Sequence, residues 1–135
     1  MTTLLSLYEY ADNANIEIDC FRMGKAECFS IVDEKGKVIV FDPYKLKSDI
    51  SEKVKLAHEI GHHATGAFYD LYADNILRAR CEYRANKWAI KKLIPKDELI
   101  EALEGGYIDV YELSEYFSVT EDFMTRALKA YGFLL

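Results

Sequence analysis

Cysteine, proline and histidine are scarce in this 135-residue chain, which has 3, 2 and 3 of them. The cysteines Cys20, Cys28 and Cys81 are too scattered, and odd in number, for a disulfide framework, so we expect free thiols in a reducing cytoplasm. The start of the chain lacks the basic segment of a signal peptide, and no apolar run approaches the length of a membrane span. With no internal repeat and no low-complexity linker, residues 1–135 are expected to form a single cytoplasmic domain away from membranes.

An even spread of charge is also lacking. The net charge is −6, and residues 96–135 carry all of it, with 3 basic and 9 acidic side chains, whereas the first 95 residues balance at 14 of each sign. This acidic part argues against direct nucleic-acid binding and favours a basic partner, if it has a partner. A solvated acidic face that keeps the protein in solution explains the charge equally well.

The hydrophobic pattern predicts an α+β fold. We expect an N-terminal helix and a small antiparallel sheet in residues 1–47, two active-site helices in 48–95, and an acidic helical tail in 96–135. Ser48, Asp49 or Ser51 can cap the first active-site helix, and Gly66 can end it. The expected helices are Leu4–Ala14, 52–66, 73–93, a short one after Pro95, 109–117 and 120–131, and the expected strands are Ile16–Cys20, Glu27–Asp33 and Lys37–Phe41, the last two joined at Glu34-Lys35-Gly36.

The most informative stretch, residues 58–62, reads H-E-x-x-H within a predicted helix. Positions i and i+4 share one face of a helix, so His58 and His62 can bind one metal ion. Glu59 lies beside them without being a ligand, where it can act as a general base, an arrangement typical of zinc hydrolases. The remaining histidine, His63, points about 100° away from His62 on the helix.

A hydrolytic zinc site needs a third protein ligand, and no histidine remains to supply it. Glu82 is the first candidate, because it lies early in the next predicted helix, at the border of that helix's apolar stripe. Asp70 and Asp74 in the connecting loop are the next candidates. Cys81 points into the predicted core, where a cysteine more often packs as a small apolar side chain.

Two further roles stay open at this point. Asn86 lies one helical turn after Glu82 and could hydrogen-bond its carboxylate, or it could be an ordinary polar residue of the helix. A donor that stabilises an oxyanion is not identified, because Tyr69, Tyr72 and Arg78 follow the histidines but each is interpreted as structural. The strand Lys37–Phe41 could bind extended substrate if it lies at a sheet edge.

These segments together resemble the ImmA/IrrE metallopeptidase family. Residues 57–62 read A-H-E-I-G-H, residues 82–89 read E-Y-R-A-N-K-W-A, and residues 93–95 read L-I-P. Residues 113–128 are similar to the helical end of that family as well. The resemblance covers about residues 50–131, while the first 45 residues carry little of the family pattern.

The resemblance implies a zinc ion held by His58, His62 and Glu82, with Glu59 as the base. It also implies a phage or mobile-element setting and a helix-turn-helix transcriptional repressor as substrate. The competing interpretation is a catalytically weak, zinc-stabilised binding module, an antirepressor that sequesters a basic DNA-binding partner. The glutamate of the motif favours the peptidase, because a pure binder does not need it.

The tail itself has a helix–turn–helix rhythm over residues 113–128, which raises the alternative of a DNA reader. In and beside this segment only Arg126 and Lys129 would attract the phosphates, which would also face Glu112, Glu115, Glu121 and Asp122. We therefore interpret the apolar positions of this segment as packing residues, namely Val110, Leu113, Phe117, Phe123, Ala127, Leu128 and Tyr131.

Overall fold

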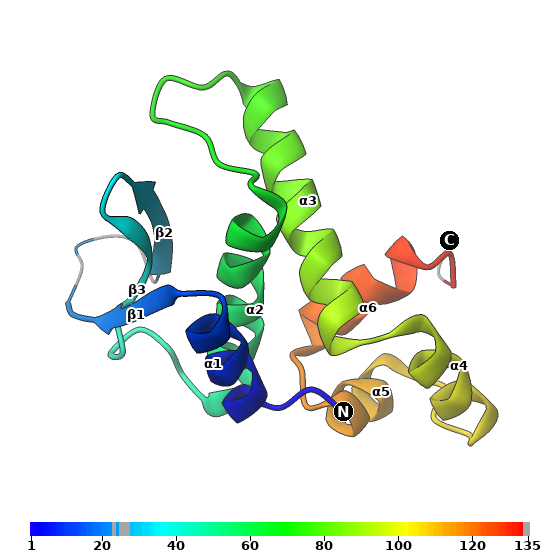
Figure 1. Ribbon diagram of the computed structural model, residues 1–135. Coiled ribbons are helices and arrows are strands. Elements are labelled where there is room, and N and C mark those ends of the chain that lie inside the picture. Colours follow the sequence, from blue (N-terminus) through cyan, green and yellow to red (C-terminus); the bar gives the residue numbers. More distant parts are fainter. Residues whose placement is uncertain (23, 25–27, 134–135) are drawn as a thin grey trace.

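The fold is α+β, as the sequence predicts. A computed structural model describes residues 1–22, 24 and 28–133, which contain a helix, a small sheet and then helices only (Figure 1). Each element coincides with an expected one to within a few residues, although Glu27, the expected start of the second strand, lies outside the described residues. The elements are α1 Leu4–Asn13, β1 Ile16–Cys20, β2 Cys28–Asp33, β3 Gly36–Phe41, α2 Asp49–Thr65, α3 Asn75–Leu93, α4 Lys96–Glu104, α5 Val110–Phe117 and α6 Glu121–Ala130.

The sheet is mixed, whereas the sequence suggested an antiparallel one. Its order is β1-β3-β2, with β2 antiparallel to β3 and β1 parallel to β3. Strands β1 and β2 thus pair with opposite sides of β3. The possibility that Lys37–Phe41 is an edge strand is therefore wrong, because β3 is central and β2 forms the edge that faces the histidine helix.

Short-range capping fixes both ends of the histidine helix α2. The Ser48 side chain accepts a hydrogen bond from the backbone N–H of Ser51, which selects the first of the three expected caps. Gly66 ends the helix in the left-handed conformation at φ 68°. That conformation costs a glycine nothing because it has no Cβ. The chain then turns back across the end of the helix instead of continuing away from it.

Helix α2 lies in the middle of the molecule, between the sheet with α1 on one side and α3 on the other (Figure 1). Its core positions Leu56, Ala57 and Ile60 are fully buried, and three polar residues of the motif segment, Glu59, His62 and His63, are buried as well. The surrounding elements thus determine the environment of each motif side chain.

Helices α2 and α3 pack unusually closely at one point. A Cβ placed on Gly61 would lie 2.6 Å from the carbonyl oxygen of Ala85, so no larger residue fits there without a backbone shift. The small side chains of Ala57, Ala85 and Ala89, all fully buried, allow the close approach along the rest of the contact. The close approach brings the early turns of α3 alongside the histidines of α2.

The tail packs as expected from its apolar positions. Leu113, Phe117, Phe123, Ala127 and Leu128 are buried in the core cluster. Val110 and Tyr131 pack against that cluster from its margin. Among the helices of the described residues, none is both long and apolar enough to span a membrane.

Candidate metal centre

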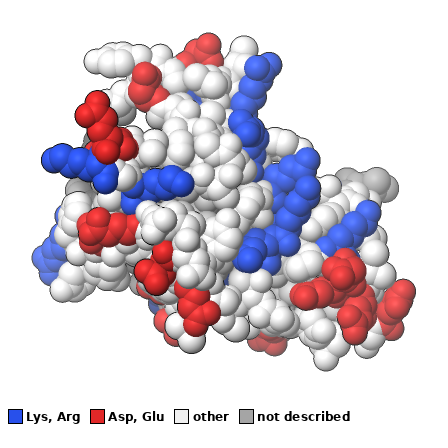
Figure 2. Space-filling model, in the orientation of Figure 1, with Lys and Arg blue, Asp and Glu red and all other residues white. Residues whose placement is uncertain are grey.

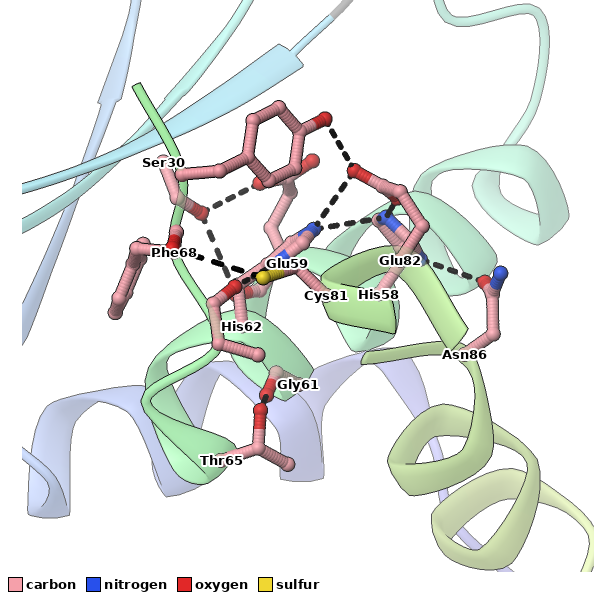
Figure 3. Close-up of polar contacts among 12 residues, drawn as sticks. Ser30, His58, Glu59, Gly61, His62, Thr65, Phe68, Cys81, Glu82 and Asn86 are labelled. Carbon is pink, nitrogen blue, oxygen red and sulfur yellow. Dashed lines mark hydrogen bonds and ion pairs between the residues drawn. The ribbon is translucent and has the colours of Figure 1, made fainter. Parts of the chain in front are cut away.

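Side chains from two helices converge on one point between α2 and α3 (Figure 3). The Nε2 atoms of His58 and His62 lie 3.2 Å apart. Glu82 from α3 places one carboxylate oxygen 2.8 Å from Nε2 of His58 and the other 3.4 Å from Nε2 of His62. One ligand atom from each residue lies within 4.8 Å of the others, so the group could hold a metal ion.

The protein fixes which nitrogen of each imidazole faces this point. Nδ1 of His62 lies 2.7 Å from the carbonyl oxygen of Ala67, which can only accept, so Nδ1 carries the proton. Nδ1 of His58 lies 2.7 Å from Oδ1 of Asn86 and donates in the same way. Both Nε2 atoms are thereby left to bind a cation, as metal-binding histidines require. Asn86 thus orients His58, whereas the sequence left open a hydrogen bond to the Glu82 carboxylate or no role beyond that of a polar helix residue.

The other candidate ligands are engaged elsewhere. The Asp74 carboxylate caps α3 by accepting from Leu77 N–H, and the Asp70 carboxylate accepts from the N–H of Tyr72 in the loop. Cys81 is buried, and its thiol lies 3.6 Å from the carbonyl oxygen of Phe68. Of the acids and the thiol that the sequence left open, the structure places Glu82 beside the two imidazoles.

His63 lies apart from this group. It is buried, and its ring packs edge-on against Phe68 with the ring centroids 5.0 Å apart. Desolvation by burial lowers the pKa of His63 below its ordinary value, so the neutral ring is favoured. This placement agrees with the angle between adjacent residues of a helix.

The carboxylate of Glu59 points towards strand β2 of the sheet. One of its oxygens accepts a hydrogen bond from the Ser30 hydroxyl (Figure 3). The other lies 3.6 Å from the Cys28 thiol. Both residues come from the edge strand β2, and sequence reasoning missed them. The signal was available, because Cys28 and Ser30 are two positions apart and so share one face of a strand.

Tyr69 also reaches the site, although the sequence interpretation treated it as structural. Its hydroxyl donates to the Glu82 carboxylate at 2.7 Å. That hydrogen bond, together with partial burial, raises the pKa of Tyr69 to about 12, so the hydroxyl keeps its proton. Arg78 has the structural role, because its guanidinium donates to the carbonyls of Leu71 and Ala73 and lies over the Tyr69 ring.

Two cavities adjoin Glu59 and Glu82, and Cys28 also lines both. The larger, of about 750 Å³, extends past His58 and Asn86 to α6. The smaller, of about 280 Å³, lies between β2 and the loop that follows α2, and Phe68 and Tyr69 line it. A chain that crosses the site from one cavity to the other would pass the Glu59 carboxylate.

The donor set suits a divalent cation. Hydrogen bonds from His58 and His62 hold the pKa of Glu82 well below its usual range. Burial alone would lower the pKa of His62, but its hydrogen bonds to Glu82 and Ala67 outweigh burial and raise it. These shifts favour a negatively charged Glu82 carboxylate next to a protonated imidazole. A metal cation that binds nitrogen and oxygen ligands can replace that proton.

Two histidines one helical turn apart, a carboxylate from a neighbouring helix and a second carboxylate beside them form a metallopeptidase-like centre on an α+β fold. The chain belongs to the ImmA/IrrE metallopeptidase family, since the family profile described as IrrE N-terminal-like domain (Peptidase_M78) matches residues 17–129. This match begins in β1 and so includes the sheet, where the sequence showed little of the family pattern. A comparison with curated proteins found no match.

Proposed function

We propose that the protein is a zinc-dependent endopeptidase. The observation that supports this most strongly is the convergence of the His58 and His62 Nε2 atoms with the Glu82 carboxylate, beside a Glu59 carboxylate that is hydrogen-bonded by Ser30. Two nitrogens and one carboxylate are a common ligand set of catalytic zinc. The cavities on both sides of Glu59 fit a chain that continues past the cut in both directions, which is what an endopeptidase binds.

In this proposal His58, His62 and Glu82 bind the zinc ion, and Glu59 acts as the general base and then the general acid. Bound zinc would supply a Lewis acid that lowers the pKa of a water to near 7 and polarises the scissile carbonyl. Glu59 would take the proton from the attacking water and pass it to the leaving amine. The Ser30 hydroxyl orients the Glu59 carboxylate. The Tyr69 hydroxyl donates to Glu82 in this structure and would turn its single proton from Glu82 to the developing oxyanion.

We further propose that the substrate is a cytoplasmic regulatory protein, a helix-turn-helix transcriptional repressor of a phage or mobile element. Family membership supports this choice, and so does the surface charge. Exposed acidic side chains on α4 and α5 would attract a basic, DNA-binding protein over a distance of about 8 Å at physiological salt. In a reducing cytoplasm the Cys28 thiol beside Glu59 would stay reduced.

The second candidate is a zinc-stabilised antirepressor that binds such a repressor without cutting it. The acidic surface of α4 and α5 favours it as much as it favours the peptidase. The placement of Glu59 does not favour the antirepressor, because a binding module needs no buried carboxylate that Ser30 holds at a cleft.

The test uses the zinc-loaded protein and the repressor encoded beside its own gene. The wild type should cut the repressor, and Glu59→Gln should bind zinc equally well but not cut, because the amide is nearly the same shape and cannot accept the proton at neutral pH. Undiminished cleavage by Glu59→Gln would refute the mechanism. Equal, tight repressor binding without cleavage by both proteins would favour the antirepressor.

A further inference from the structure

A groove runs between α3 and α6, next to the metal centre. It encloses about 460 Å³ and has Ile90 and Phe123 in its floor, each 6% exposed. A cavity of this size holds several side chains of a peptide rather than a folded domain. Lys87, Ile90 and Lys91 line the groove from α3, and Phe123, Arg126 and Lys129 line it from α6.

Four basic side chains rim this apolar floor. Lys87 and Lys91 are four residues apart on α3, and Arg126 and Lys129 are three apart on α6, so each pair lies on one helical face. All four are exposed. Within the part of the chain that the structure describes, no carboxylate lies within ion-pair distance of the three lysines, and Arg126 contacts only the exposed Asp122, at 3.4 Å.

This rim stands out on a chain whose net charge is −6. Figure 2 shows basic side chains gathered where α3 and α6 lie, and acidic side chains gathered beyond them where α4 lies. A merely solvated surface of an acidic protein would have mixed signs around the groove. Four exposed cations around an apolar floor, of which only Arg126 has a carboxylate partner among the described residues, are instead complementary to a ligand that is both acidic and apolar.

The groove is continuous with the active-site cleft. Asn86, Phe123 and Arg126 line both the groove and the larger of the two cavities at the metal centre. Asn86 also holds the His58 ring in position. A chain seated in the groove would therefore lead directly to the site where Glu59 and the metal ligands converge.

We propose that the α3–α6 groove binds an acidic amphipathic segment of the protein substrate and so feeds the neighbouring chain into the cleft. That this segment belongs to a substrate rests on the proposed peptidase function, whereas the binding of an acidic segment in the groove does not. Leucine-like side chains of the segment fill the floor over Ile90 and Phe123, and its carboxylates pair with Lys87, Lys91 and Lys129. A nucleic acid fits less well, because it has no aliphatic side chains for the floor and its phosphates would meet the acids of α4.

The probe is a fluorescein-labelled amphipathic peptide built from leucine and glutamate, titrated by anisotropy against zinc-loaded Glu59→Gln protein. Reversing the α3 pair with Lys87→Glu and Lys91→Glu should weaken binding by about tenfold or more, and added salt should weaken binding to the parent protein. The milder Lys87→Gln and Lys91→Gln pair should act in the same direction and guards against misfolding. The matched control, Lys47→Glu with Lys96→Glu, makes the same change of charge on exposed lysines outside the groove and should leave binding unchanged.

Equal binding by the groove and control variants would overturn the proposal, and so would tight binding of the same peptide with lysine in place of glutamate. Short duplex DNA that binds more tightly than the peptide, and loses affinity in the same variants, would assign the groove to nucleic acid instead. Failure of the peptidase function looks different: the acidic peptide would still bind through the groove although the wild-type protein cuts nothing.

Discussion

At the scale of single residues, the site depends on hydrogen bonds that leave both imidazole Nε2 atoms free. The Ala67 carbonyl and the Asn86 amide oxygen accept from the two Nδ1–H groups, and Glu82 completes the set from another helix. In the proposed zinc site, removing Glu82 would take away a ligand, whereas removing another acid of the same region would change only the charge.

Glu82→Ala is therefore expected to lower zinc affinity sharply, by at least the 10–100-fold that loss of even an indirect partner of a metal site costs. The matched control is Asp70→Ala, which removes a nearby acid whose carboxylate caps only a loop turn. Zinc content after dialysis against a competing chelator measures both. Full retention of zinc by Glu82→Ala, with loss in Asp70→Ala, would move the third ligand into the loop.

Tyr69→Phe is expected to lower kcat by about 100-fold, as loss of an oxyanion donor does, with little change in KM or zinc content. The reason is that the Tyr69 hydroxyl lies 2.7 Å from the Glu82 carboxylate and that its raised pKa keeps it protonated. Tyr72→Phe is the control, because Tyr72 is in the same loop but 94% exposed. If kcat stays the same while zinc content falls, Tyr69 only supports Glu82.

At the scale of elements, the site exists because α2 and α3 approach closely. Gly61 lies one residue before His62 and faces Ala85, one turn along from Glu82. The distance between these two backbones sets how far the Glu82 carboxylate is from the imidazoles.

Gly61→Ala should destabilise the fold by about 1–3 kcal/mol, because overpacking against a backbone carbonyl outweighs the roughly 1 kcal/mol that alanine gains over glycine within a helix. Zinc affinity should fall with it. Gly105→Ala is the matched control, because the nearest atoms to its Cβ would be 3.4 Å away at an ordinary helical φ of −77°. Urea unfolding of both variants measures the difference in stability. Equal midpoints for the two variants would show that α3 can shift to accommodate the added Cβ.

At the scale of the whole molecule, a buried lysine connects helix α2 to the end of helix α5. Lys53 of α2 is 5% exposed, and its ammonium group donates to the carbonyl of Phe117 at the end of α5, 2.8 Å away and 64 residues on. Desolvation by burial lowers the pKa of Lys53 from 10.5.

A lowered pKa in the folded state means that the unfolded chain binds more protons between that pKa and 10.5, so stability should rise with pH across this window. Lys53→Met removes the titration, and the stability of the wild type relative to this variant should therefore increase as pH rises towards 10.5. Denaturant unfolding at several alkaline pH values measures the difference. Parallel profiles for the two proteins would contradict the argument, and the exposed Lys47→Met substitution controls for the change in net charge.

The sequence by itself determined the α+β order of elements and their limits, because capping by Ser48, the left-handed stop at Gly66 and the spacing of apolar residues act within a few residues of each other. The same short range placed His58, Glu59 and His62 on neighbouring positions of one helix, and Glu82 was a candidate from its place on the next apolar stripe.

Only the tertiary structure decided what lies around them. Ser30 and Cys28 face Glu59 because β2 takes the outer edge of the sheet, and β1 pairs in parallel with the other side of β3. Asn86 bonds to His58 instead of Glu82, and basic residues far apart in the sequence line one groove. These contacts join segments whose separation along the chain carries no periodic signal, so they follow from how the elements pack rather than from any local pattern.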